Sequence, residues 1–285
     1  MKPQKALHMY IEKDKKKPKY IGHAYMLFQK YDGWYGYLEG GKIYSRAGRL
    51  IPSLQHLNMP HLSSTRLLFE ILVNKVPEFH LMNGILNRKE RCNAAYFKVH
   101  DMIVPDDTRN FAERFGDLHQ MLKRNPEWKY EHALHYAAPL GVSNDPLIWQ
   151  QAAEKVWSIG GEGVILKRVD APYDAGKRNC NLMKIKEECT VDLLVVGMAM
   201  GEGKYHSTLG KLILRDKSGK EHRVSGMTDT QRDEWWRAPK GTIKCPHPIM
   251  GRVVEVKAMK QLKDGSLREP RFKAIRYDKL PMEID

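Results

Sequence analysis

The chain has 285 residues, of which 42% are hydrophobic and 29% charged, a balance typical of a folded protein rather than a disordered one. Its 48 basic and 34 acidic residues give a net charge of +14 at pH 7, which favours a polyanionic partner such as nucleic acid. The 4 cysteines form no C-x-x-C pair, which argues against a zinc site or a disulfide framework. No apolar run has the length of a signal peptide or a membrane span, so we expect a cytoplasmic protein with no membrane partner.

The first part of the chain predicts three strands around one lysine. Aromatic-rich runs of strand length occupy residues 25–28 and 34–38, and the pair Gly40-Gly41 predicts a hairpin turn before a strand at 42–44. Lys30 stands between the first two runs, next to a turn-forming Asp-Gly pair. We therefore expect this lysine at the end of a strand, in the floor of a pocket.

Two longer apolar runs predict further strands, at residues 67–73 and 96–104, with a polar stretch between them. Glu70 lies inside the first run, and period-two alternation puts it on the same face as Leu68 and Leu72. A carboxylate among apolar neighbours is costly unless a cation or another polar partner meets it. A metal ion or a sugar hydroxyl is therefore expected near Glu70.

Two helices and another strand follow. Residues 110–122 place apolar side chains at helical spacing, and Asp145-Pro146 has the composition of a helix start, with a helix end at Gly160-Gly161. The glycine pair then leads into a strand at 164–168, with Glu162 at its entrance and Lys167 near its end.

The composition changes around residues 186–191, which predicts two domains, 1–188 and 189–285. The second domain contains short strands separated by turns and a single helix, an arrangement typical of a small Greek-key barrel of the OB type. The expected strands are 193–196, 212–215, 221–224 and 252–259, and the expected helix is 229–237.

Lys30-Tyr31-Asp32-Gly33 resembles the K-x-D-G motif of the covalent nucleotidyltransferases. Further segments follow in the order of the motifs of ATP-dependent DNA ligases, and together they span most of the chain. They are SRAG at 45–48, Glu70, EGVILK at 162–167, MKIK at 183–186 and RYDK at 276–279. The resemblance is to the compact phage and bacterial type, which would place the protein in a bacterium or a phage-infected host cell. It implies an α+β fold, with a nucleotidyltransferase domain of ATP-grasp-like antiparallel sheets and helices followed by an OB-fold β-barrel.

The resemblance assigns Lys30 as the nucleophile that attacks the α-phosphate of ATP. A lysine amine has a reference pKa of about 10.4, so a nucleophilic lysine needs desolvation or neighbouring cations. The other nucleotide-binding residues implied by the motifs are Gln29, Asp32, Gly33, Arg46, Glu70, His100, Glu162, Lys167, Lys184, Lys186, Arg276 and Lys279.

Within this set, Glu70 and Glu162 would supply oxygen ligands, one to the ribose and one to Mg²⁺ or Mn²⁺. Arg46 would bind the ribose or a 5′-phosphate, and Lys204 and Lys211 would join it in DNA binding. His100 occupies a position where the family often has an aromatic ring stacked on the base, with Tyr96 and Phe97 as alternatives.

The function implied is the sealing of 5′-phosphate/3′-hydroxyl nicks in duplex DNA by a monomer, through a lysyl-AMP intermediate and an adenylated 5′ end. Arg276 and Lys279 would contact the departing pyrophosphate. RNA ligases and mRNA-capping guanylyltransferases share the K-x-D-G lysine and are the nearest alternatives. A non-catalytic nucleic-acid-binding OB protein is a further alternative of a different class.

Overall fold

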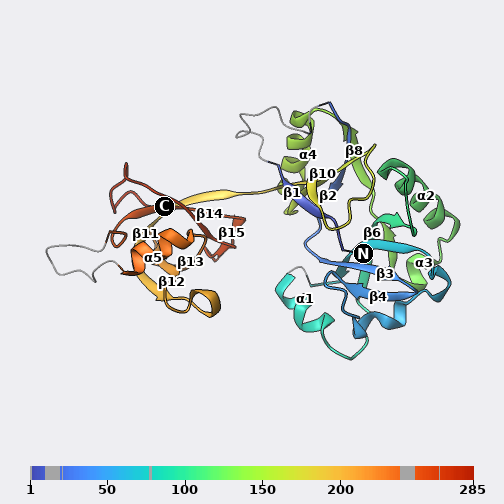
Figure 1. Ribbon diagram of the computed structural model, residues 1–285, viewed down its shortest axis with the longest axis horizontal. Coiled ribbons are helices and arrows are strands. Elements are labelled where there is room, and N and C mark those ends of the chain that lie inside the picture. The colour runs from blue at the N-terminus through green and yellow to red at the C-terminus, as the bar shows by residue number, and fades with distance from the viewer. Residues whose placement is uncertain (1, 10–19, 21, 77–78, 238–247, 263) are drawn as a thin grey trace. The chain divides into compact units, whose positions relative to one another are not determined.

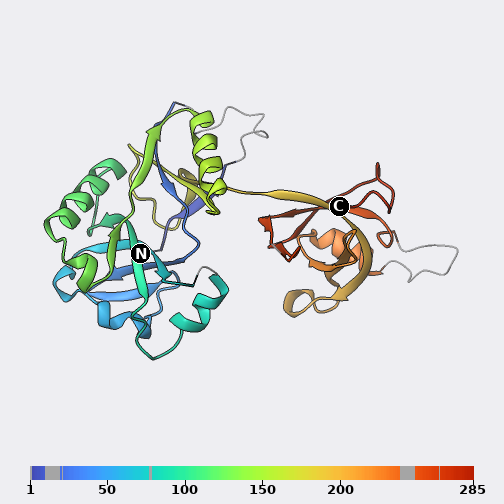
Figure 2. The ribbon, with the colours of Figure 1, turned by 180° about the vertical axis from the view of Figure 1, so that it is seen from behind.

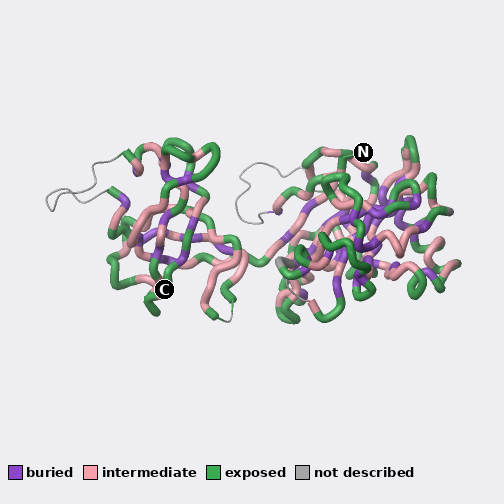
Figure 3. The backbone as a smooth tube through the Cα atoms, turned by 90° about the horizontal axis from the view of Figure 1, so that it is seen from below, coloured by how far each residue is buried: buried purple, intermediate pink, exposed green. Residues whose placement is uncertain are grey.

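The computed structural model describes residues 2–9, 20, 22–76, 79–237, 248–262 and 264–285 (Figure 1). It divides into two compact units, Met1–Lys186 and Glu187–Asp285, next to the boundary expected after residue 188. Each unit has buried residues at its own centre (Figure 3). Among the described helices, none combines the length and the apolar character that crossing a bilayer requires.

The N-terminal unit contains two five-stranded sheets. The first has the order β1 (Lys5–His8), β10 (Arg178–Lys186), β9 (Gly163–Arg168), β2 (Tyr25–Gln29) and β8 (Pro139–Ser143). The second has the order β4 (Lys42–Ser45), β3 (Trp34–Glu39), β5 (Arg66–Val73), β6 (Ala95–Ile103) and β7 (Leu134–Tyr136). Neighbouring strands are antiparallel except β1 with β10 and β6 with β7. The strand predictions around Lys30 are confirmed, since β2, β3 and β4 occupy the expected runs.

Helices of this unit lie beside the sheets, as the two opposite views show (Figures 1 and 2). They are α1 (Phe79–Leu86), α2 (Phe111–Arg124), α3 (Trp128–Glu131) and α4 (Pro146–Ser158), with 3-10 turns η1 (Pro52–Leu57) and η2 (Pro60–Leu62). The start of α4 confirms the prediction, because the Asp145 side chain accepts from the Leu147 N–H at 2.8 Å. Helix α2 starts with a capping box between Asn110 and Glu113.

Helix α4 covers one face of the first sheet and fixes which side chains point away from it. Trp149, Ala153 and Val156 are buried at helical spacing against apolar residues of β2, β9 and β10. Because side chains alternate along a strand, the residues between those buried positions must face the opposite side. That opposite face carries the lysines of the site described below.

The segment between β5 and β6 differs from the prediction. A polar stretch was expected there, but α1 occupies part of it, and Gly84 lies inside the helix. A glycine costs a helix interior about 1 kcal/mol relative to alanine. Met82 and Leu86 are almost completely buried in the core, so tertiary packing offsets that cost.

The C-terminal unit is a closed barrel built on one antiparallel sheet. The strand order is β13 (Glu221–Val224), β12 (Leu209–Arg215), β11 (Cys189–Met200), β14 (Val253–Ala258) and β17 (Arg271–Ile275). The Phe272 N–H donates to the Ser225 carbonyl at 2.7 Å, which joins β17 to the chain just after β13 and closes the barrel. Helix α5 (Asp229–Arg237) buries Trp235 in the barrel core. Short elements η3 (Gly203–Tyr205), β15 (Lys260–Gln261) and β16 (Leu267–Arg268) complete it.

Strand β11 is longer than the four residues expected at 193–196. Its first half pairs with β14 and its second half with β12, and the register shifts near Gly197. A strand that changes partners at a bulge bends between them. This gives one long, curved strand where the apolar pattern predicts only its buried middle.

Candidate active site

The first sheet presents lysines from three neighbouring strands on the face opposite α4. Lys184 and Lys186 alternate with buried residues on β10, Lys167 does the same on β9, and Lys30 follows the last residue of β2. The sequence predicted that Lys184 and Lys186 share a face, and the register with β9 supports this. These strands are adjacent in the sheet, so the lysines gather in one region.

Glu162 joins two of these lysines. Its Oε2 atom accepts from Lys30 Nζ at 2.6 Å, and its Oε1 atom lies 2.7 Å from Lys186 Nζ. The Glu162 side chain is only 7% exposed, whereas that of Lys30 is 20% exposed. A buried carboxylate therefore holds the Lys30 amine in place while part of the amine stays accessible to a ligand.

Gly163 lets the backbone support this contact. The Lys30 N–H donates to the Gly163 carbonyl at 2.8 Å, which continues the pairing of β2 with β9. Gly163 has a φ of +140°, and a Cβ atom there would lie 2.1 Å from the Ile185 carbonyl oxygen. Any side chain at this position would push β9 away from β10 and displace Glu162.

Glu70 lies across from Tyr35 and Lys98 in the second sheet and is close enough to Lys30 and Glu162 to be affected by their charges. The pKa of Glu70 is raised to about 7, mainly by burial; the charge of Lys30 opposes the rise and the charge of Glu162 adds to it. A Cβ atom on Gly33 would lie 2.7 Å from the Glu70 Cγ atom, so the glycine makes room for this carboxylate.

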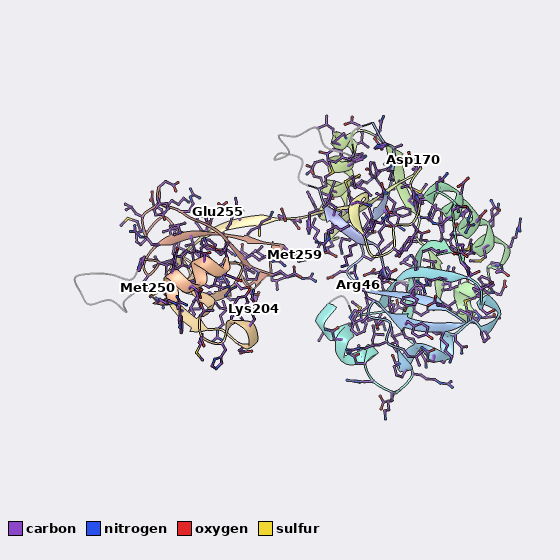
Figure 4. All side chains as sticks on the ribbon, viewed as in Figure 1. Arg46, Asp170, Lys204, Met250, Glu255 and Met259 are labelled. Carbon is purple, nitrogen blue, oxygen red and sulfur yellow. The ribbon has the colours of Figure 1, made fainter. Side chains whose placement is uncertain are left out.

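Arg46 stands in a turn between Ser45 and Gly48, where the Gly48 N–H donates to the Ser45 carbonyl at 2.9 Å (Figure 4). Gly48 has a φ of +76°, a conformation that favours glycine. The Arg46 guanidinium lies 5.5 Å from the centre of the Tyr35 ring, and its charge lowers the pKa of Glu70. The structure thus brings Arg46 to the edge of the group formed by Lys30, Glu70 and Glu162.

Lys167 and His100 form a second, more deeply buried cluster. Lys167 Nζ lies 3.0 Å from His100 Nδ1, 2.9 Å from the His100 carbonyl and 3.4 Å from Asp101 Oδ2. His100 is the extra residue in a bulge of β6, because Val99 and Asp101 pair with consecutive residues of β5. The bulge frees the His100 carbonyl from the strand ladder, so that it can accept from Lys167.

The protonation of this cluster follows from its contacts. Burial and the Lys167 charge together lower the pKa of His100 to about 3, so the ring is neutral at pH 7. Burial also lowers the pKa of Lys167 to about 8, although Asp101 opposes that shift. An ammonium has three donors and no acceptor, so Lys167 requires His100 Nδ1 to accept and leaves the ring proton on Nε2.

The remaining predicted residues of this unit lie near the same face. Burial lowers the pKa of Lys184, and the charges of Lys186 and Lys30 lower it further. Gln29 ends β2, directly before Lys30, and Asp32 lies in the turn between β2 and β3. The structure therefore gathers the lysines, both glutamates and Arg46 around one region, and places His100 beside Lys167.

Arg276 and Lys279 belong to the C-terminal unit and meet on a buried carboxylate there. Arg276 Nη1 and Lys279 Nζ each lie 2.7 Å from Asp192 Oδ2. Arg276 also pairs with Asp278 at 2.7 Å. Any phosphate that binds these two cations must compete with Asp192.

The two lysines predicted to bind DNA are both exposed. Lys204 (Figure 4) pairs with Asp229 at 2.8 Å, an exposed contact of the kind that contributes little to stability. Lys211 lies on the exposed side of β12, between buried Leu209 and Leu212.

Sequence reasoning missed three charged residues that organise these clusters. Asp192 and Asp101 belong to none of the predicted sets, because each gains its role only through contacts made in the fold. Arg114 binds Asp101 with Nε at 3.0 Å and is almost completely buried. The signal for Arg114 was present, because it interrupts the apolar stripe formed by Phe111, Phe115 and Leu118.

Comparison with protein families shows which family the chain belongs to. Residues 41–186, just over half of the chain, match the model described as "ATP dependent DNA ligase domain". The chain belongs to this ATP-dependent DNA ligase family. Residues 200–276 match "DNA ligase OB-like domain", in agreement with the barrel.

Curated relatives are also DNA ligases. The chain is 26% identical over 216 residues to the DNA ligase of Haemophilus influenzae, covering 74% of this chain and 75% of that protein. DNA ligase 2 of Haloquadratum walsbyi is 28% identical and a probable DNA ligase of Anaeromyxobacter dehalogenans 30% identical, each over 168 residues. Those matches cover 52% of this chain but only 27% and 32% of the two relatives.

Solved ligase structures share the fold. The structure described as "DNA binding with a minimal scaffold: Structure-function analysis of Lig E DNA ligases" has a TM-score of 0.72 at 20% identity, over 96% of this chain and 98% of that one. The bacteriophage T7 ligase in complex with ATP has a TM-score of 0.57 at 22% identity, over 96% and 98% of the two chains. The predicted α+β nucleotidyltransferase domain followed by an OB-like barrel is confirmed.

Proposed function

We propose that the chain seals nicks in duplex DNA with ATP as the energy source, through a covalent Lys30-AMP intermediate. The observation that carries this proposal is the Lys30–Glu162–Lys186 contact, which holds a partly exposed amine among further lysines. The T7 relative was solved with ATP and the Lig E relatives are described as binding DNA, which supports both substrates for this family member.

In the first step the Lys30 amine loses a proton and attacks the α-phosphate of ATP. The bond from Nζ to phosphorus forms as the bond from the α-phosphorus to the bridging oxygen breaks, and pyrophosphate leaves with those electrons. Glu162 Oε2, 2.6 Å from Lys30 Nζ, is placed to accept the proton. Lys184 and Lys186 offset the negative charge on the phosphate during the attack.

In the second step AMP passes from Lys30 to the 5′-phosphate at a nick. In the third step the adjacent 3′-hydroxyl displaces AMP and forms the phosphodiester bond. The lysine amine is regenerated in the second step, when the bond from Nζ to phosphorus breaks, and AMP leaves in the third step as the 3′-hydroxyl loses its proton and forms the new bond.

Glu70 and Glu162 could supply part of the ligand set of a divalent cation such as Mg²⁺ or Mn²⁺, because each has a carboxylate. Burial is the main cause of the raised pKa of Glu70, and the charge of Glu162 adds to it, so a cation bound beside this carboxylate would favour its ionised form. Within the described ranges no group of three or more acidic, histidine or cysteine side chains gathers as metal ligands. Magnesium is often held by one or two carboxylates together with substrate phosphates and water, and when bound it would polarise the phosphate.

Incubation with labelled ATP or GTP, followed by denaturing electrophoresis, tests the first step. We expect a labelled protein band with ATP and none with GTP. A chase with nicked DNA should then release the label and yield sealed strands. A band only with GTP would support a capping enzyme, and transfer only to RNA would support an RNA ligase. The absence of any covalent adduct would support the alternative of a non-catalytic nucleic-acid-binding protein.

The C-terminal residues are proposed to act in two separate ways. If Arg276 and Lys279 contact only pyrophosphate, replacing both with alanine should impair adduct formation while sealing of a pre-adenylated nick survives. Replacing Lys204 and Lys211 with alanine should instead weaken binding of nicked DNA and leave adduct formation in place. Equal loss of both activities in both double variants would contradict this separation.

A further inference from the structure

A basic cavity of about 450 Å³ lies on the N-terminal unit, where β6, β7, the end of α2 and α3 meet. Its basic and aromatic lining comes from Lys98, Lys123, Lys129, His119, His135 and Tyr136. The volume falls within the usual range for ligand sites. We name this group the lysine cavity.

The charges of the lysine cavity have no acidic counterpart. Among its lining residues there is no carboxylate, and in the described part of the chain no ion pair involves Lys98, Lys123 or Lys129. Burial lowers the pKa of Lys98 and the charge of Lys129 lowers it further. The same two lysines also help to lower the pKa of His135. Like charges held together in this way favour an anion that enters from outside.

The cavity continues the reacting site along the second sheet. Register partners place Tyr35, Glu70, Lys98 and His135 side by side on β3, β5, β6 and β7, and directly paired residues share a face. Adjacent strands are about 4.8 Å apart, so the cavity begins roughly one strand from Glu70. Lys98 Nζ also lies 5.8 Å from the ring centre of Tyr31, the residue after Lys30.

We propose that the lysine cavity binds backbone phosphates of the DNA strand as that strand leaves the reacting nick. The inference rests on the proposed function and adds a binding surface to it. A polymer substrate extends beyond the reacting phosphate, so it can reach a basic cavity one strand away. The rings of Tyr136 and His119, whose centres are 4.8 Å apart and whose planes are tilted by 59°, stand beside the lysines and can contact a sugar or a base.

The test uses the full chain and a labelled nicked duplex with a dideoxy 3′ end, without ATP. Lys123 and Lys129 are exposed and free of ion pairs among the described residues, so Lys123→Gln with Lys129→Gln should leave the thermal melting temperature unchanged. Binding is measured across a series of salt concentrations. Two lost phosphate contacts should make the slope of log K against log salt shallower by about 1.8.

The matched control is Lys89→Gln with Lys155→Gln, which removes two exposed lysines of the same unit away from the cavity. Its slope should equal that of the unaltered protein. Shortening the duplex on one side of the nick should abolish the difference between the cavity variant and the unaltered protein, because the strand no longer reaches the cavity.

Equal slopes for the two double variants would overturn the proposal. A cavity variant that loses affinity for free ATP instead of DNA would also overturn it and assign the cavity to a nucleotide. If the unaltered protein forms an adduct with AMP and seals nicks while either result holds, only the cavity inference fails. If no sealing occurs at all, the proposed function fails.

Discussion

Glu162 joins Lys30 to Lys186, and Asp101 joins Lys167 to Arg114, so the N-terminal unit contains two clusters of a carboxylate and two cations. They differ in how completely the lysine is bound. Lys167 has acceptors for all three of its protons and a side chain that is 10% exposed, whereas that of Lys30 is 20% exposed and has one carboxylate contact. Because all three protons of Lys167 have acceptors, Lys167 stabilises its neighbours. Lys30 has fewer contacts, so its amine can react.

The strongest test of this comparison is Lys30→Met. We expect the covalent adduct with AMP to fall below detection, a loss on the order of 10⁴-fold or more, because the attacking atom is gone. The free energy of unfolding should change by only about 1 kcal/mol, because Lys186 still meets Glu162. Adduct formation with labelled ATP and urea denaturation measure the two quantities.

Lys30→Arg should fail in the same way, since a guanidinium stays protonated. Lys155→Met, on the exposed side of α4, is the control and should retain the adduct. An adduct of normal yield in Lys30→Met would remove Lys30 as the nucleophile.

The second test replaces the carboxylate of each cluster with an amide. Asp101→Asn leaves Lys167 and Arg114 buried without an anion, which should cost about 3–5 kcal/mol of unfolding free energy. Glu162→Gln should cost less than Asp101→Asn, because Lys30 is 20% exposed and can turn toward water. Urea denaturation of both variants at pH 7 decides, and equal costs would mean that both clusters are structural.

The sequence predicts those site residues that lie in short local motifs, but not the contacts between distant elements. Lys30, Glu162 and Lys186 sit in short motifs with alternating strand neighbours, so their common face follows from local pattern. The Asp101–Arg114 pair joins a strand to a helix, and no local pattern specifies that contact. The bulge at His100 is also invisible, because it arises from the pairing of β6 with β5.

The third test uses pH. The pKa of Glu70 is about 7 in the folded protein and 4.5 as its ordinary value, so the folded state favours the protonated form. The free energy of unfolding should therefore fall as the pH rises from about 4.5 through 7, because the Glu70 carboxyl ionises more readily in the unfolded chain than in the folded protein. Glu70→Gln removes that cost and should be more stable than the unaltered protein at pH 8, by roughly 3 kcal/mol at most.

At pH 4 the Glu70→Gln variant and the unaltered protein should have similar stability, since the glutamate of the unaltered protein is then mostly neutral in both the folded and the unfolded state. Thermal melting at the two pH values gives the comparison. A variant stabilised equally at pH 4 and pH 8 would show that the benefit does not come from ionisation.

The smallest expected effect is a change in one proton position. Nitrogen NMR of the imidazole should find His100 neutral between pH 5 and 7, with its proton on Nε2, because Lys167 donates to Nδ1. Lys167→Met removes both that donor and a nearby positive charge, so the pKa of His100 should rise and the Nδ1–H tautomer should appear. Lys155→Met should leave the His100 signals unchanged. Titration of His100 between pH 5 and 7 in the unaltered protein, or a proton on Nδ1, would show that Lys167 does not fix the ring and that the two lysine clusters are less different than their contacts indicate.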